Sequence, residues 1–162
     1  MLVFVRAILY AVLFMGLVLI WAPAALLEQA SIAQPPVFGA AQWLGAAVTT
    51  AGLLLAVLCV TTFARIGRGT PAPFDPPRRL VTSGPYRYVR NPMYLGAGLA
   101  LLGLALYYQS WLVIGYTLIL LALVSAFIRL YEEPNLHRLF GMDYAVYCER
   151  VPRWIPMRPP AA

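Results

Sequence analysis

The 162-residue sequence predicts an all-α integral membrane protein with four transmembrane helices. Hydrophobic residues make up 62% of the chain and charged residues only 11%, whereas about a quarter of the residues in a soluble domain are charged. The apolar residues form four runs, and the twelve basic residues, all arginine, lie near or beyond the ends of these runs. Membrane topology therefore explains the net charge of +6 more simply than nucleic-acid binding does.

The first two predicted spans are residues 4–27 and 40–64. At about 1.5 Å per residue, each is long enough to cross a hydrocarbon core of about 30 Å. A signal peptide is the alternative for the first run, but that run exceeds the usual apolar region of about 7–15 residues, which favours a retained helix. The second run contains small residues that predict close helix packing: Gly45, Ala46, Thr49, Gly52 and Ala56.

Residues 94–107 and 111–130 are predicted to form a helical hairpin that turns at residues 107–110. The first arm is short for a span, and its glycines would let the two arms, or a ligand, approach closely. If the N-terminus is cytoplasmic, four spans place the polar connection of residues 65–91 and the tail on the same cytoplasmic side. All twelve arginines then lie at or near that side, in agreement with the positive-inside rule.

The tail is predicted to start a new helix at Glu132-Glu133-Pro134, because acids followed by proline are typical of a helix N-terminus. Its apolar residues recur at helical spacing, which predicts an amphipathic helix lying at the membrane interface: Leu136, Leu139, Phe140, Tyr144 and Tyr147. The chain is interpreted as one domain, with two N-terminal spans in residues 1–64, a core in residues 65–156 and a tail in residues 157–162.

Two polar segments, residues 80–94 and 129–156, are the candidates for chemistry. In the second, Arg129, Glu132 and Glu133 can share one helix face, and ionisable groups near the membrane boundary are costly unless they are paired or functional. From spacing alone, an ion pair that anchors the helix end explains them equally well. The tyrosines and arginines of the first segment likewise fit an interfacial aromatic belt with snorkelling arginines.

The two segments together carry a more specific pattern. Residues 84–96, GPYRYVRNPMYLG, followed by residues 132–156, EEPNLHRLFGMDYAVYCERVPRWIP, resemble the isoprenylcysteine carboxyl methyltransferase family and the related phospholipid methyltransferases. The family pattern is R-H-P-x-Y, an apolar hairpin, E-E-x-x-L, F-G, spaced tyrosines and V-P-R-x-x-P, and the resemblance covers roughly residues 71–156. The family histidine is Asn91 here, and an amide can form hydrogen bonds but cannot titrate near neutral pH.

This resemblance implies methyl transfer from S-adenosylmethionine to a lipophilic carboxylate, amine or thiol that arrives from the bilayer. A carboxylate suits the ammonium group of this cofactor, an arginine suits its carboxylate and an aromatic face suits its sulfonium. Arg129 and Glu133 correspond to a charged pair at the catalytic centre. The implied cofactor-binding residues are Tyr88, Arg90, Asn91, Tyr94, Gly96, Gly98, Arg129, Glu132 and Glu133. No metal site is expected, because the chain has one histidine and two widely separated cysteines.

Two other functions remain open. Sterol reductases and steroid 5α-reductases, which use NADPH, end in a similar pattern but usually contain more spans. A non-catalytic membrane partner would need only the spans and the arginine-rich connection, and it would leave the paired motifs unexplained. Thermal stabilisation by S-adenosylmethionine or by NADPH would distinguish the two enzyme classes, and binding of nucleic acid is expected for none of the three.

Overall fold

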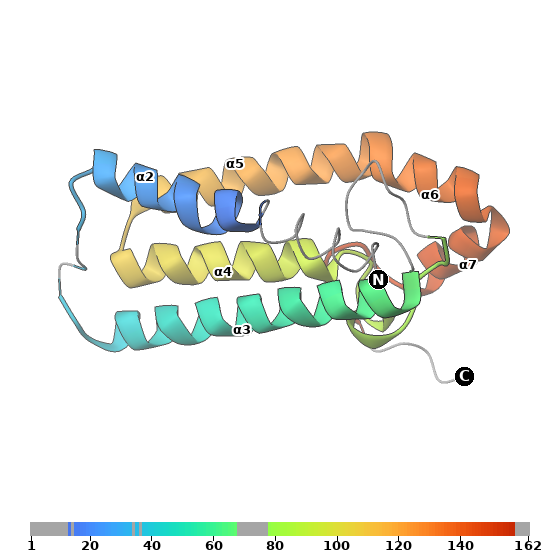
Figure 1. The fold of residues 1–162 in the computed structure, drawn as a ribbon, viewed down its shortest axis with the longest axis horizontal. Coiled ribbons are helices and arrows are strands. Elements are labelled where there is room, and N and C mark those ends of the chain that lie inside the picture. Colours follow the sequence, from blue (N-terminus) through green and yellow to red (C-terminus); the bar gives the residue numbers. More distant parts are fainter. Residues whose placement is uncertain (1–12, 14, 34, 36, 68–77, 158–162) are drawn as a thin grey trace.

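The computed structural model of the chain (Figure 1) describes residues 13, 15–33, 35, 37–67 and 78–157. Every regular element within these residues is a helix, as predicted. The elements in chain order are η1 (Gly16–Trp21), α2 (Ala22–Gln29), α3 (Ala40–Thr62), η2 (Phe63–Gly67), η3 (Gly84–Arg87), α4 (Pro92–Tyr108), α5 (Trp111–Phe127), η4 (Ile128–Glu132), α6 (Glu133–Phe140) and α7 (Met142–Arg150).

Two continuous helices are long and apolar enough to cross a membrane, Ala40–Gly67 and Trp111–Phe140. Two shorter apolar helices, Gly16–Gln29 and Pro92–Tyr108, accompany them. The predicted second, third and fourth spans therefore coincide with α3, α4 and α5. Residues 4–12 and 14 of the predicted first span, residues 4–27, lie outside the described residues, and the described part of this span is helical.

Helix α4 is the centre of the bundle, with α3 on one side and α5 on the other (Figure 1). Its contact with α3 is made by glycines on both helices. A Cβ atom added to Gly52 would lie 2.5 Å from Gly96 O, and one added to Gly45 would lie 2.7 Å from Gly103 O. The two backbones touch directly, which only residues without a side chain allow. The prediction of close packing by small residues is confirmed, although Ala46 is exposed.

The hairpin between α4 and α5 turns where the sequence predicts it. Gln109 takes a left-handed conformation, with φ of 50°, which ends α4. Ser110 then caps α5, because its side chain accepts a hydrogen bond from the Val113 N–H. The two helices run antiparallel, so α4 begins and α5 ends at the same end of the bundle (Figure 1).

The helix predicted to start at Glu132-Glu133-Pro134 is α6, which begins at Glu133 with Pro134 in its first turn. It is not separate from the preceding helix, because the helical path from Trp111 continues through to Phe140. Pro134 lacks an N–H and would normally interrupt a helix. Here it follows a π-helical turn, η4, in which the Glu133 N–H donates to the Ile128 carbonyl oxygen. Because the backbone hydrogen bond just before the proline spans five residues instead of four, the helix continues past Pro134.

The predicted amphipathic tail helix is two helices rather than one. Gly141, with φ of 52° and ψ of −124°, separates α6 from α7, and only glycine adopts this conformation readily. Because the helix turns back here, Tyr144 and Tyr147 are buried against Leu136, whereas Leu139 is 52% exposed.

All arginines that the structure describes belong to one end of the bundle, where α3 ends, α4 begins and α5 passes into α6 (Figure 1). Trp43 and Trp111 are exposed near the starts of α3 and α5, at the opposite end. Exposed tryptophan is typical of a membrane–water interface. The helix arrangement thus agrees with the charge asymmetry from which the topology was predicted, and we call the arginine-bearing end the polar end.

Candidate functional site

At the polar end, residues 151–157 lie against the start of α4. The Arg90 N–H donates to the Pro152 carbonyl oxygen at 2.9 Å. The side-chain amide of Asn91 donates through Nδ2 to the Arg153 carbonyl oxygen at 3.2 Å. These bonds join segments that are about sixty residues apart in the sequence, and they bring the side chains that follow Pro152 next to those that precede α4.

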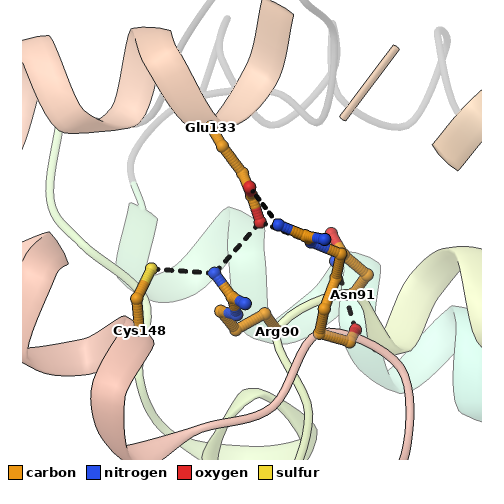
Figure 2. A network of polar contacts seen from close by, with 5 residues as sticks. Arg90, Asn91, Glu133 and Cys148 are labelled. Atoms are coloured by element: carbon orange, nitrogen blue, oxygen red, sulfur yellow. Dashed lines mark hydrogen bonds and ion pairs between the residues drawn. The ribbon is translucent and has the colours of Figure 1, made fainter. Parts of the chain in front are cut away.

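Glu133 lies at the centre of an ion cluster beside this junction. Its carboxylate accepts two hydrogen bonds from Arg153, at 2.9 Å to Nε and 2.7 Å to Nη2, and one from Arg90 Nη1 at 3.0 Å. The side chains of Arg90 and Glu133 are each 14% exposed, and that of Arg153 is 28% exposed. We call Arg90, Glu133 and Arg153 the Glu133 cluster. Figure 2 shows Arg90 and Glu133 directed toward each other.

The cluster carries more positive than negative charge, because two guanidinium groups surround one carboxylate. Arg90 Nη1 also contacts the Cys148 sulfur at 2.9 Å, so that Arg90 connects the loop before α4 with α6 and α7 (Figure 2). The buried Nε of Arg90 has no acceptor among the described residues. Hydrogen bonding to Glu133 raises the pKa of Arg153, and this bidentate pair is the strongest contact of the cluster.

Two tyrosines brace the helices around the cluster. The Tyr94 hydroxyl, from the first turn of α4, donates to Glu132 Oε2 at 3.1 Å. The Tyr147 hydroxyl, from α7, donates to the Tyr86 carbonyl oxygen at 2.7 Å. Burial raises the pKa of Tyr147, so its phenol remains a proton donor at neutral pH. Glu132 at the end of η4 and Tyr147 on α7 are thus both bonded to residues 86–94.

The structure brings most of the predicted cofactor-binding residues to this one place. Arg90 and Glu133 are paired, Tyr94 and Glu132 are paired, and Asn91 lies at the junction with the C-terminal segment. Tyr88 precedes them in the same loop and is 46% exposed. Residues that are far apart in the sequence therefore form a single polar site where α4 begins and α6 starts.

The pairing expected between Arg129 and Glu133 does not form. Arg129 lies one helical turn before Glu133 and is exposed, while both oxygens of Glu133 are occupied by Arg90 and Arg153. The difference arises because residues 151–157 fold back over the site and bring an arginine that is closer than the helical neighbour.

The two predicted glycines of α4 face different neighbours. Gly96 is buried against α3, where a Cβ atom would lie 2.8 Å from Gly52 O. Gly98 faces α5, where a Cβ atom would lie 3.1 Å from Leu121 Cδ2. Gly96 therefore serves helix packing, while Gly98 borders an apolar groove.

This groove, which we call the α4–α5 groove, has a volume of about 350 Å³. Ser125 provides the one polar side chain of its lining. Trp154, which directly follows Arg153 of the Glu133 cluster in the sequence, also lines the groove. The lining residues are Leu95, Gly98, Leu99, Leu102, Leu121, Ala122, Ser125 and Trp154.

Three residues of this region, Arg153, Trp154 and Cys148, were absent from the predicted site. For Arg153 the sequence contained a signal, because it is the arginine of the V-P-R element that ends the motif. No comparable signal pointed to the other two. Their places depend on the backbone bonds that hold residues 151–157 against α4.

The site offers groups for binding rather than for acid–base chemistry. The carboxylate of Glu133 suits an ammonium group, and the two arginines suit a carboxylate. Asn91 cannot act as a base near neutral pH, and its amide already donates to a backbone carbonyl. Within the part of the chain that the structure describes, no group of three or more histidine, cysteine or acidic residues is arranged to hold a metal ion.

Comparison with known proteins agrees with this picture. Residues 40–143 match the family model described as phospholipid methyltransferase. The match begins with α3 and extends into α7, so it includes the α3–α4 contact, the α4 and α5 residues that line the groove, and Glu133. Searches of curated proteins and of solved structures found no significant match.

Proposed function

The chain belongs to the phospholipid methyltransferase family, and we propose that it transfers a methyl group from S-adenosylmethionine to a lipophilic acceptor at a membrane surface. The observation that carries the proposal is the Glu133 cluster. It presents a carboxylate between two arginines beside an apolar groove. A ligand with an ammonium and a carboxylate group would therefore find a partner for each, next to a site for an apolar molecule.

In this proposal the amino-acid part of the cofactor enters the Glu133 cluster and exchanges partners with it. Glu133 would bind the ammonium group, and Arg90 would bind the carboxylate and satisfy its unused Nε donor. The rings of Tyr88 and Tyr94 would lie near the adenine or the sulfonium. Asn91 and Glu132 would hold the surrounding loop and helix through the bonds that they already make.

The exposed Arg129 has a different place in this proposal. One turn before Glu133, it would contact the cofactor carboxylate or the acceptor head group once Glu133 has exchanged partners. Arg129 and Glu133 remain our proposed catalytic residues in the sense that both touch the reactants. Gly96 would allow α3 and α4 to pack closely, and Gly98 would leave room in the α4–α5 groove. Neither glycine would contact the cofactor.

The methyl transfer itself needs little acid–base chemistry. The acceptor atom would attack the methyl carbon in line with the sulfonium, the carbon–sulfur bond would break, and S-adenosylhomocysteine would leave as a neutral thioether. A carboxylate acceptor releases no proton in this step, and an amine or thiol acceptor would release its proton to water. Positioning and exclusion of water can supply much of the acceleration. This mechanism is compatible with Asn91 in place of the family histidine, because no step requires a titrating group there.

We further propose that four helices cross the membrane, namely residues 4–27, α3, α4 and α5, within a single methyltransferase domain. The polar end and both termini would face the cytoplasm, where the cofactor is available, and the acceptor would arrive from the bilayer. The arginines at the polar end and the exposed tryptophans at the opposite end support this orientation.

A binding measurement on the purified, membrane-reconstituted protein tests the proposal. We expect S-adenosylmethionine to bind and to raise the melting temperature, and Glu133→Gln to weaken binding measured by calorimetry. Glu149→Gln is the matched control, because Glu149 is an exposed acid on α7. Stabilisation by NADPH with none by S-adenosylmethionine would reject the proposal in favour of a reductase.

A labelling experiment identifies the acceptor. Membranes that contain the protein are incubated with methyl-labelled S-adenosylmethionine, and the lipid or small molecule that gains the label is isolated. Transfer that requires Glu133 is the expected outcome. Cofactor binding without transfer to any lipophilic molecule would contradict the proposed acceptor class.

A further inference from the structure

We propose that the arginines around the end of α3 bind the head group of an anionic phospholipid. The group, which we call the α3-end patch, consists of Arg65, Arg78, Arg79 and Arg87, and all four are exposed. None of the four belongs to the Glu133 cluster or lines the α4–α5 groove. The inference goes beyond the proposed methyl transfer, because it requires only that the chain is inserted in a membrane.

Packing around the end of α3 brings the arginines of the patch together from separate parts of the chain. Arg65 belongs to η2, and the Arg78 N–H donates to the carbonyl oxygen of Gly67, the last residue of η2, at 2.8 Å. Farther along, a Cβ atom added to Gly84 would lie 3.3 Å from Thr62 Oγ1 on α3. The segment that carries the other three arginines is therefore held against the helix end that carries Arg65 (Figure 1).

The positive charge of the α3-end patch is not balanced by nearby acids. The described residues 63–67 and 78–87 contain the four arginines and no acid. Both ion pairs of the described part of the chain involve Glu133, so none of the four arginines is paired there. Residues 129–150, by contrast, carry three arginines and four acids. The positive-inside rule explains why arginine gathers on one side of the membrane, but it does not explain this difference between two segments of the same end.

The depth of the patch matches that of lipid phosphates. Trp43 is exposed near the opposite end of α3, and exposed tryptophan is typical of the membrane–water interface. The 22 residue steps from Trp43 to Arg65 correspond to roughly 33 Å along the helix, slightly more than a hydrocarbon core of about 30 Å. Arg65 would therefore lie in the head-group layer, where a guanidinium group can bind a phosphate through two parallel hydrogen bonds.

The helix surface next to the patch favours a lipid over a soluble phosphate compound. Leu54, Val57 and Leu58 are exposed in the turns of α3 that precede Arg65, and Ile66 follows it with an exposed side chain. A phospholipid whose phosphate binds the arginines would lay its acyl chains along this apolar surface. Clusters of basic residues directly beside a membrane span are typical of sites for anionic lipids.

Electron paramagnetic resonance tests the lipid preference. The purified protein is reconstituted in phosphatidylcholine bilayers that contain a little spin-labelled phosphatidylglycerol or, separately, spin-labelled phosphatidylcholine. The fraction of label that the protein immobilises gives the relative affinity of the two lipids. We expect a several-fold preference for phosphatidylglycerol that falls in about 1 M salt, where charges are screened beyond about 3 Å. Equal immobilisation of the two lipids would overturn the inference.

Matched double variants show whether the preference arises at the patch. Arg78→Gln combined with Arg79→Gln removes two of its charges and leaves the backbone bond of residue 78 in place. Each basic residue near an anionic surface strengthens binding about fivefold, so most of the preference should be lost. Arg138→Gln combined with Arg150→Gln is the control, because it removes two exposed arginines from α6 and α7, and it should keep the preference. Equal losses in the two double variants would indicate attraction by net charge alone and would reject the site.

A second pair guards against misfolding. Arg65→Gln combined with Arg87→Gln removes the other two charges of the patch and should lose the preference to a similar extent. Undiminished preference in either patch variant, once circular dichroism shows that it is folded, would also reject the site. Arg78→Lys combined with Arg79→Lys keeps the charge and should retain most of the preference.

The measurement separates this inference from the proposed function, because it is made without S-adenosylmethionine. A lipid preference that depends on the patch in a protein that binds no S-adenosylmethionine would support the patch and reject only methyl transfer. Methyl transfer by a protein that shows no such preference would reject only the patch.

Discussion

Arg153 holds Glu133 through two parallel hydrogen bonds, from Nε to Oε1 at 2.9 Å and from Nη2 to Oε2 at 2.7 Å. The two residues come from different elements, α6 and the segment that follows α7. Their bidentate geometry places the C-terminal segment over the start of α4. The same contact sets one wall of the α4–α5 groove, because the next residue is Trp154.

Arg153→Lys should loosen this contact even though the charge is kept. A lysine cannot donate two parallel bonds, and a hydrogen bond to a charged group contributes about 1.5–3 kcal/mol. Because Arg153 is 28% exposed, we expect a loss of stability at or below the lower end of that range, together with weaker S-adenosylmethionine binding. Thermal unfolding and calorimetry measure the two effects, with the exposed Arg150→Lys on α7 as control. Equal behaviour of both variants would contradict a specific role for the bidentate pair.

Gly103→Ala should destabilise the bundle. A Cβ atom at Gly103 would lie 2.6 Å from Gly45 O, so the backbones of α3 and α4 would have to separate. Overpacking of this kind typically costs about 1–3 kcal/mol. Thermal unfolding in detergent or lipid measures the change.

The control variant for that experiment should not lose stability. Gly115→Ala on α5 adds a methyl group in open space and replaces glycine with a residue that favours helices by about 1 kcal/mol. It should leave the melting temperature unchanged or raise it. Equal losses in both variants would show that the α3–α4 contact does not depend on its glycines.

Asn91→Asp should weaken the junction between α4 and the C-terminal segment. Asn91 is 7% exposed, and its Nδ2 donates to the Arg153 carbonyl oxygen. A carboxylate would place an acceptor against an acceptor, and a buried unpaired group costs about 1–3 kcal/mol. Asn135→Asp is the control, because the Asn135 oxygen accepts a bond from Arg138 that aspartate can keep. A stability of Asn91→Asp equal to that of the control would exclude the proposed bond.

Gly141→Ala tests the break between α6 and α7. Nothing lies within 4 Å of a Cβ atom there, so any loss of stability comes from the backbone, whose φ is +52°. Residues held in this region cost about 1–3 kcal/mol. We expect a lower melting temperature and, because Tyr147 would shift on α7, weaker S-adenosylmethionine binding. An unchanged melting temperature would indicate that α6 and α7 can join without the turn.

Much of the fold followed from simple regularities in the sequence. The lengths of the apolar runs predicted α3, α4 and α5, and a left-handed Gln109 followed by a Ser110 cap formed the expected hairpin. Two local predictions were only partly right. Pro134 stands in the first turn of α6 as predicted, yet a π-helical turn joins this helix to α5 without a break. Gly141 was interpreted as part of a helix, although it ends one.

The site was predictable as a set of residues but not as a set of contacts. Apolar run length, the clustering of arginine at one end and the paired motifs around Asn91 and Glu133 depend on the order of residues, so they are visible in the sequence. The partner of Glu133 is decided by which side chain comes nearest in space, and Arg153 displaces Arg129 because hydrogen bonds to residues 90 and 91 fold the C-terminal segment over the site. The α4–α5 groove likewise exists only once two helices and Trp154 are packed together.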